Sequence, residues 1–321
     1  MPAELKPKIG LALGSGSARG MAHVGIIREL EAVGIRPDII CGSSAGSLIG
    51  AACILGKMQE LCTWVQALSK SDMVRYMDIR LATGGGFAHG YRLMEHLSAN
   101  LGNPRIEHIR PRFVAVATDL HSGREIWLQE GPIWSAVRAS IALPGMFTPV
   151  AKDNLWLVDG GLVNPVPVSV CRAMGADIII AVNLNGDRVG RRTRGKQPGR
   201  SALEPTDAAA QATPQIAEAA FLERLSYTIK GRAQPLFDQW LNRDRSLPGI
   251  FDVMASSINI MQDRITRARL AGEPADVILA PRLGNLGLLD LDQADDAIQE
   301  GHRCVRRNID QLEMILQSTA G

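Results

Sequence analysis

The chain lacks most of the features that mark membrane, secreted or metal-binding proteins. No apolar run approaches the roughly 18 residues that a helix needs to cross a bilayer. The apolar run near the N-terminus, residues 9–13, is too short for the core of a signal peptide. The five cysteines form no CxxC pair, so neither a disulfide framework nor a zinc site is indicated. We therefore expect a cytoplasmic protein, which would contact lipid only from the aqueous side.

A large excess of charge is also missing. The formal net charge of the 321 residues is +2, so the charge balance does not point to nucleic acid as a partner. Apolar residues make up 46% and charged residues 21% of the chain, which is the balance of an ordinary globular protein. This length is sufficient for a sizeable core in one large domain or two ordinary ones.

Short apolar runs alternate with stretches of helical periodicity along the chain. Ile9–Leu13 is predicted as a buried strand, and apolar residues then recur at helical spacing up to Gly34. A second strand at 38–41 and a second apolar helix at 48–55 repeat this order. Further strands are predicted at 113–118, 126–128, 155–158, 178–182 and 277–279. The alternation predicts an α/β fold, with a parallel sheet and helices on both of its faces.

The composition of the chain changes near residue 187. From there to residue 214 the chain is rich in Arg, Gly, Ala and Pro and nearly lacks large apolar residues. We therefore predict a core at 8–185, a basic linker or insertion at 186–214, and a mostly helical part at 215–321 that packs on the core. The basic side chains of 188–200 either attract anionic lipid headgroups or solvate the linker.

Three helices are predicted in the C-terminal part, at 214–231, 250–270 and 291–316. The second carries an apolar stripe at helical spacing, made of Ile250, Phe251, Met254, Ile258, Met261 and Ile265. Ordinary core packing is the interpretation we favour for this stripe, and contact with lipid or with a second subunit is the alternative.

A G-x-S-x-G motif follows the second predicted strand. Gly42 and Gly46 let the backbone turn sharply, so that the hydroxyl of Ser44 projects from the turn. The helix that follows places partial positive charge near this hydroxyl, which favours an anionic adduct. Because the motif lies between a strand and a helix, it predicts a nucleophilic serine, and a helix-capping serine is the alternative.

A serine nucleophile needs a base, and two residues are candidates. In the order usual for α/β-hydrolases, Ser44, Asp159 and His302 would form a triad, but His302 lies in a polar helical stretch typical of a surface. Asp159 ends an apolar strand and precedes Gly160 and Gly161, which places its carboxylate at the rim of the sheet. It could accept the serine proton directly if desolvation raised its pKa above about 3.9. A turn aspartate that caps its own loop is the alternative.

A glycine-rich loop, GSGSARG at 14–20, joins the first strand to the first helix. A dinucleotide fingerprint would need glycine where Arg19 stands, and a phosphate loop would need a Gly-Lys-Ser/Thr ending. The loop fits better as an oxyanion hole, in which the amides of Gly16, Ser17 and Ala18 face the oxygen that becomes negative when Ser44 attacks a carbonyl. A nucleotide-binding module and a plain strand-to-helix turn are the alternatives.

These segments, taken in order, resemble the patatin-like phospholipase family, in its bacterial branch related to neuropathy target esterase. The resemblance spans roughly residues 8–185; residues 14–20, 42–46 and 159–161 carry it, and RASIALPG at 138–145 and NPVP at 164–167 support it. It implies a three-layer α/β/α sandwich with a mostly parallel central sheet, and a Ser–Asp dyad of Ser44 and Asp159. Arg19 matches the family's basic residue at the oxyanion hole. Serines at 15 and 17 depart from the glycine run of many members, and a positive φ there would strain them.

The resemblance implies hydrolysis of carboxylic esters of a phospholipid or lysophospholipid through an acyl-serine intermediate. No metal or other cofactor is expected, since no segment resembles a calcium loop. Peripheral contact with the inner face of the membrane and assembly into a homo-oligomer are both compatible with the sequence, and residues 84–88 could form a flap. Two alternatives are a triad hydrolase that uses His302 and a binding scaffold that keeps the fold with little activity.

Overall fold

The computed structural model describes residues 6–68, 72, 75, 76, 78, 88–187, 250–287 and 290–320. The predicted basic stretch 188–200, the predicted helix 214–231 and the glycines at 84–86 lie outside these residues. Of the described residues, 6–187 and 254–320 belong to one compact unit. The division into core, linker and helical part stays a prediction.

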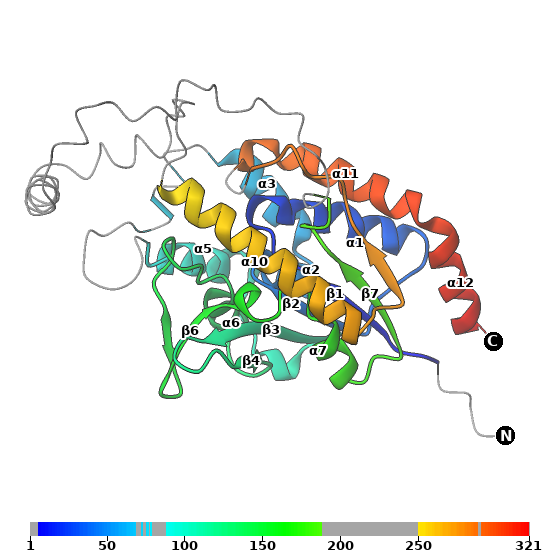
Figure 1. Ribbon diagram of the computed structural model, residues 1–321, viewed down its shortest axis with the longest axis horizontal. Helices are drawn as coiled ribbons and strands as arrows, with labels where there is room; N and C mark the ends of the chain where they lie inside the picture. The colour runs from blue at the N-terminus through cyan, green and yellow to red at the C-terminus, as the bar shows by residue number, and fades with distance from the viewer. Residues whose placement is uncertain are drawn as a thin grey trace, which may run out of the picture. The chain divides into compact units, whose positions relative to one another are not determined.

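Eight strands of the described residues form one sheet, with the hydrogen-bonded order β5-β6-β3-β2-β1-β7-β8 and β4 paired to β3 (Figure 1). Strands β3, β2, β1, β7 and β8 run parallel, whereas β4 and β6 run antiparallel to β3 and β5 runs antiparallel to β6. The strands are β1 (Ile9–Leu13), β2 (Ile39–Ser43), β3 (Arg112–Asp119), β4 (Glu125–Leu128), β5 (Val150–Lys152), β6 (Leu155–Asp159), β7 (Ile178–Val182) and β8 (Val277–Leu279).

Helices cover both faces of the sheet, so the fold is the expected three-layer α/β/α sandwich. Alternate strand residues point to opposite faces. Leu11 and Ile40 belong to a core cluster with helices α1, α2, α3, α5, α6 and α11, and Ala12 and Cys41 belong to another with α7. The helices are α1 (Ala22–Ala32), α2 (Ala45–Ile54), α3 (Met58–Ala67), α5 (Tyr91–Leu101), α6 (Ile133–Ser140), α7 (Val168–Ala173), α10 (Ile250–Gly272), α11 (Ala294–Arg307) and α12 (Ile309–Ala320).

Two elements differ from the sequence-based expectation. The single helix expected at 291–316 is a short 3₁₀ turn, Leu291–Gln293, followed by α11 and α12. The helix is interrupted at Asn308, whose side chain donates to the Cys304 carbonyl at 2.8 Å and so competes with the helical backbone. Strand β5 was not expected; it forms a hairpin with β6 through Asp153 and Asn154, which both have positive φ.

The register of β3 brings the ends of β2 and β6 together. Val116 pairs with Ser43 of β2, and Ala117 pairs with Asp159 of β6. Both of these β3 residues also pair with β4, so β2 and β6 share the opposite edge of β3. Because β2 is parallel to β3 and β6 antiparallel, their C-terminal ends meet. The two segments that follow, each carrying a predicted site residue, therefore start side by side.

Candidate active site

Ser44 occupies a strained turn between β2 and α2. Its φ of 53° and ψ of −121° lie outside the regions that residues with a Cβ ordinarily adopt. Its backbone amide donates to Ser140 Oγ at 3.0 Å, and its carbonyl accepts from Ser47 Oγ at 2.7 Å. These bonds on both sides hold the turn, so the hydroxyl of Ser44 is left to point away from the backbone.

The two glycines of the motif allow this turn to pack. A Cβ at Gly42 would lie 2.5 Å from the backbone nitrogen of Ser47, on the helix that the turn begins. A Cβ at Gly46 would lie 2.0 Å from the carbonyl oxygen of Leu13, at the end of β1. Both contacts are shorter than any real Cβ makes, so the two positions require glycine to keep α2 close to the sheet.

The side chains of Ser44 and Asp159 meet. Ser44 Oγ donates to Asp159 Oδ2 at 2.6 Å, and the amide of Gly161 donates to Asp159 Oδ1 at 2.7 Å. Asp159 has no exposed surface, whereas Ser44 is half-buried. Burial raises the pKa of the Asp159 carboxyl to about 6, although the bonds from Ser44 and Gly161 oppose the change. Asp159 therefore both caps its own turn and contacts the serine, so the two interpretations of this residue hold together.

Gly160 lets the Asp159 segment approach β3. A Cβ there would lie 2.1 Å from the carbonyl oxygen of Val116 and 2.9 Å from Ser43 Oγ. The Asp159 carbonyl accepts from Thr118 Oγ1 at 2.8 Å, which ties the end of β6 to β3. These close contacts keep the carboxylate at the serine.

The glycine-rich loop packs against the same turn. Its Gly20 lies so close to Ala45 that a Cβ on Gly20 would stand 2.6 Å from the Cβ of Ala45. The amide of Ser15 donates to the Pro165 carbonyl at 2.8 Å, and the amide of Arg19 donates to the Gly16 carbonyl at 3.2 Å. The amides of Gly16, Ser17 and Ala18, between these two, lie at the beginning of the 3₁₀ helix Ser17–Met21, where no preceding turn supplies acceptors.

The two serines of the loop differ in backbone conformation. Ser17 has a φ of 52°, the left-handed region that costs a residue with a Cβ free energy, so the strain expected of a positive φ applies there. The loop nevertheless keeps its short 3₁₀ helix. Arg19 is fully buried, and its Nη2 donates to Asn259 Oδ1 of α10 at 2.9 Å.

The candidate base His302, and His23 next to the glycine-rich loop, both have partners other than Ser44. His302 Nδ1 pairs with Glu29 Oε2 at 2.8 Å, across the contact between α11 and α1. His23 is buried, and its Nε2 bonds to the Gly14 carbonyl at 2.8 Å. Burial lowers the pKa of His23 to about 4, so its ring is neutral at pH 7 and donates this bond. Neither contact brings an imidazole to Ser44.

Three polar residues of the site were not predicted from the sequence. Ser140 ends α6 and accepts the Ser44 amide, and Asn259 and Gln262 of α10 contact the glycine-rich loop. Ser140 lies within the family-like stretch 138–145, which was the available signal. The two α10 residues are far from every motif along the chain, so only folding reveals them.

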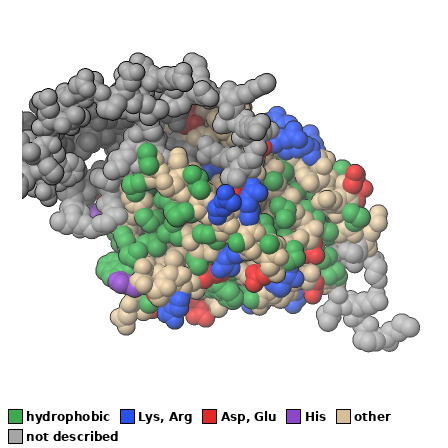
Figure 2. All heavy atoms as spheres, viewed as in Figure 1, with side chains coloured by type: hydrophobic (Ala, Val, Ile, Leu, Met, Phe, Trp, Pro, Cys, Tyr) green, Lys and Arg blue, Asp and Glu red, His purple; other side chains and the backbone are tan. Residues whose placement is uncertain are grey.

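The interpretation of the α10 stripe as ordinary core is wrong for two of its members. Met254 and Met261 are 36% and 49% exposed, and Ile260 beside them is 60% exposed. Figure 2 shows hydrophobic side chains at the surface of the face that α10 crosses. The helix instead buries Gln262 and Thr266, and Gln262 bonds to Ser15 of the glycine-rich loop and to Asn185, which follows β7.

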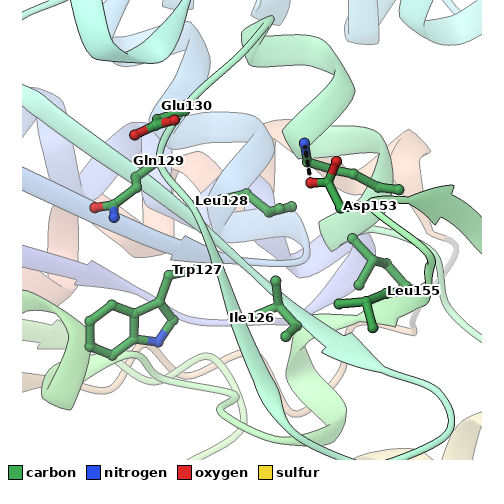
Figure 3. Close-up of a pocket in the computed structure, with 9 residues that line it drawn as sticks. Ile126, Trp127, Leu128, Gln129, Glu130, Asp153 and Leu155 are labelled. Atoms are coloured by element: carbon green, nitrogen blue, oxygen red, sulfur yellow. Dashed lines mark ion pairs between the residues drawn. The ribbon is translucent and has the colours of Figure 1, made fainter.

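A separate pocket of about 210 Å³ lies beside β4, β5 and β6 (Figure 3). Lys152 and Asp153 form an ion pair at 3.1 Å on its wall. Ser44 and Asp159 do not line this pocket, so we assign it no part in the chemistry. The lining residues are Ile126, Trp127, Leu128, Gln129, Glu130, Lys152, Asp153, Leu155 and Leu157.

Among the described residues, no cluster of three or more histidine, cysteine or acidic side chains is arranged to hold a metal ion. The same part of the chain contains no helix that is long and apolar enough to cross a membrane.

Fold and site together define a three-layer α/β/α protein with a serine–carboxylate pair where two strands of the sheet end. A family model of patatin-like phospholipases matches residues 11–172. Uncharacterized NTE family proteins of Mycobacterium bovis and Mycobacterium tuberculosis are each 30% identical over 336 residues, covering 96% of this chain and 93% of theirs. The chain belongs to the patatin-like phospholipase family.

Two further similarities either cover less of the chain or have a lower sequence identity. Lysophospholipase nte1 of Aspergillus fumigatus is 32% identical over 185 residues, which cover 55% of this chain and 12% of that protein. The crystal structure of VipD from Legionella pneumophila is 13% identical, with a TM-score of 0.43, and the match covers 95% of this chain and 67% of that one.

Proposed function

We propose that this protein is a serine hydrolase that cleaves carboxylic esters of phospholipids or lysophospholipids. The observation that carries the proposal is the 2.6 Å hydrogen bond from Ser44 Oγ to the buried carboxylate of Asp159. Membership of the patatin-like phospholipase family supports a lipid substrate. The name of the fungal relative, a lysophospholipase, supports lysophospholipids in particular.

Ser44 is the proposed nucleophile and Asp159 the proposed base. Ser44 Oγ forms a bond to the ester carbonyl carbon while its proton passes to Asp159 Oδ2. The tetrahedral intermediate then expels the alcohol part of the lipid, which takes the proton from Asp159, and leaves an acyl-serine. Water, deprotonated by the same carboxylate, attacks the acyl carbon. The bond from that carbon to Ser44 Oγ then breaks, Oγ takes the proton back from Asp159, and the fatty acid is released.

The environment of Asp159 suits a base at neutral pH. A carboxylate with an ordinary pKa of 3.8 is a weak acceptor, and burial raises the pKa of this one to about 6. The Gly161 amide keeps Oδ1 occupied, so Oδ2 is directed at the serine. Above pH 6 the carboxylate is ionised and ready to take the proton.

The amides of Gly16, Ser17 and Ala18 are the proposed oxyanion hole. They begin a 3₁₀ helix that packs against the start of α2, next to Ser44. Amides at such a position are aimed at charge that develops during the reaction, and losing one donor of this kind costs about 3 kcal/mol. Arg19, the family's basic residue, would act through its contact with Asn259 rather than by touching substrate.

Peripheral contact with a lipid surface accompanies this proposal. Met254, Ile260 and Met261 are exposed on α10, whose opposite side contacts the glycine-rich loop. Apolar side chains in such a place would let the protein meet aggregated lipid near the site where the ester must enter.

Hydrolysis of lysophosphatidylcholine and of phosphatidylcholine vesicles by the wild-type protein and by Ser44→Ala tests the proposal. We expect fatty acid release from the wild type only, and a serine-directed fluorophosphonate should label Ser44 only in the wild type. Ser135→Ala is the matched control, because Ser135 is exposed on α6 and its hydroxyl is not part of the turn that holds Ser44. Absence of both turnover and label in the wild type would instead support a scaffold of low activity.

A further inference from the structure

Helix α10 buries polar side chains and exposes apolar ones. Gln262 and Thr266 are 5% and 1% exposed, whereas Ile260 and Met261 are 60% and 49% exposed. An amphipathic helix that packs on a core ordinarily shows the reverse. A buried polar face needs hydrogen-bond partners, so the position of α10 is set by what that face contacts.

Gln262 bonds to the glycine-rich loop. Its Oε1 accepts from Ser15 Oγ at 3.1 Å and from Asn185 Nδ2 at 3.4 Å, and all three residues are buried. Ser15 directly precedes the three amides of the proposed oxyanion hole. Asn185 follows β7, so one side-chain oxygen connects the loop after β1 with the segment after β7.

The amide nitrogen of Gln262 lies beside the Asp159 turn. A Cβ on Gly161 would stand 2.4 Å from Gln262 Nε2, 2.9 Å from Asp159 Oδ1 and 3.0 Å from the Cβ of Ser15. Gln262, the carboxylate and the loop therefore surround the same glycine. A larger residue at 161 would displace the end of the Gln262 side chain from this position.

Asn259 makes the second bond from α10 to the loop. Its Oδ1 accepts from Arg19 Nη2 at 2.9 Å, and Arg19 has no exposed surface. Asn259 and Gln262 are three residues apart, so they lie on the same side of the helix. Ser15 and Arg19 lie on either side of Gly16, Ser17 and Ala18. The loop is thus attached to α10 at both ends of the amide stretch.

We infer that Gln262 and Asn259 are positioning residues, which hold residues 15–19 so that the amides of Gly16, Ser17 and Ala18 face the acyl oxygen. This inference rests on the proposed function. It assigns part of the catalytic geometry to α10, which lies outside residues 11–172, the region that the family model matches. A displacement of about 1 Å in such a donor set can slow a reaction about 100-fold, so the two side chains matter to rate more than to substrate binding.

Steady-state kinetics of ester hydrolysis by the full-length protein test the inference. We expect Gln262→Leu, which removes the acceptor of Ser15 and Asn185, to lower kcat about 10- to 100-fold with KM changed less than about threefold. Asn259→Ala should act in the same way, and Asn259→Asp, which keeps an acceptor for Arg19, should restore most of kcat. Fluorophosphonate labelling of Ser44 should slow in parallel.

Thr266→Val is the matched control, since Thr266 is buried on α10 one turn beyond Gln262 but bonds only to the Gln262 carbonyl of its own helix among the described contacts. It should leave kcat unchanged. If Gln262→Leu does not fold, the half-buried Asn259 and its two variants decide the question. Wild-type kcat in the folded variants, with only a lower Tm, would overturn the inference and leave the proposed function standing. A wild-type protein without turnover or label would overturn both.

Discussion

Replacing Asp159 by asparagine separates the effect of the buried carboxylate on stability from its part in catalysis. The asparagine is nearly the same shape, and it can accept from the Gly161 amide and donate to Ser44 Oγ. Unlike the aspartate, it never has to ionise inside the protein. We therefore expect Asp159→Asn to be more stable than the wild type at pH 8 and to be nearly inactive, with kcat/KM lowered at least about 100-fold.

The size of the expected gain in stability follows from the shift in the pKa of Asp159. Burial raises the pKa of Asp159 from 3.8 to about 6. At about 1.4 kcal/mol for each tenfold change in proton affinity, this corresponds to about 3 kcal/mol. The folded state binds the proton more tightly than the unfolded state. The free energy of unfolding of the wild type is therefore highest below about pH 4. It falls by about 3 kcal/mol as the pH rises to about 6, and it stays at this lower value above pH 6.

Urea unfolding of both proteins at pH 4 and pH 8 measures the difference. The free energy of unfolding of Asp159→Asn should exceed that of the wild type by about 2–3 kcal/mol at pH 8 and by close to zero at pH 4. Asp119→Asn is the control of opposite sign, because the hydrogen bond from Ser122 lowers the pKa of Asp119 and favours its ionised form. A stability difference for Asp159→Asn that does not change with pH would refute the reasoning.

Three further expectations follow from the same geometry. In a pH profile, kcat/KM of the wild type should fall tenfold per pH unit below about 6, as Asp159 becomes protonated; a midpoint near 4 would contradict the role of burial. Gly46→Ala should lower Tm strongly or prevent folding, because the new Cβ would lie 2.0 Å from the Leu13 carbonyl oxygen. Gly272→Ala is the control in the same thermal melt, and it should leave Tm unchanged because no atom lies within 4 Å of the new Cβ. His302→Ala should keep turnover within about threefold of the wild type. It should lower the free energy of unfolding by about 1 kcal/mol, because the bond to Glu29 is lost. A loss of turnover by orders of magnitude would favour the triad instead.

The sequence by itself determined the local elements on which the site is built. Ile9–Leu13, Ile178–Val182 and Val277–Leu279 are strands at the predicted bounds, because short apolar runs flanked by turn residues have few other structures open to them. The spacing of Gly42 and Gly46 around a serine, between a strand and a helix, likewise located the strained turn. These are properties of neighbouring residues.

Only the tertiary structure decided which distant groups meet. The segment around Asp159 was equally compatible with a simple turn, and it reaches Ser44 because β6 pairs antiparallel with β3 on the edge that β2 occupies. The burial that raises its pKa is likewise a product of the packed layers. Gln262 and Asn259 come to the glycine-rich loop from more than 200 residues away along the chain, on a helix whose apolar stripe suggested the wrong face. Periodicity records which residues share a side of a helix, whereas the partners available across the fold select the side that is buried.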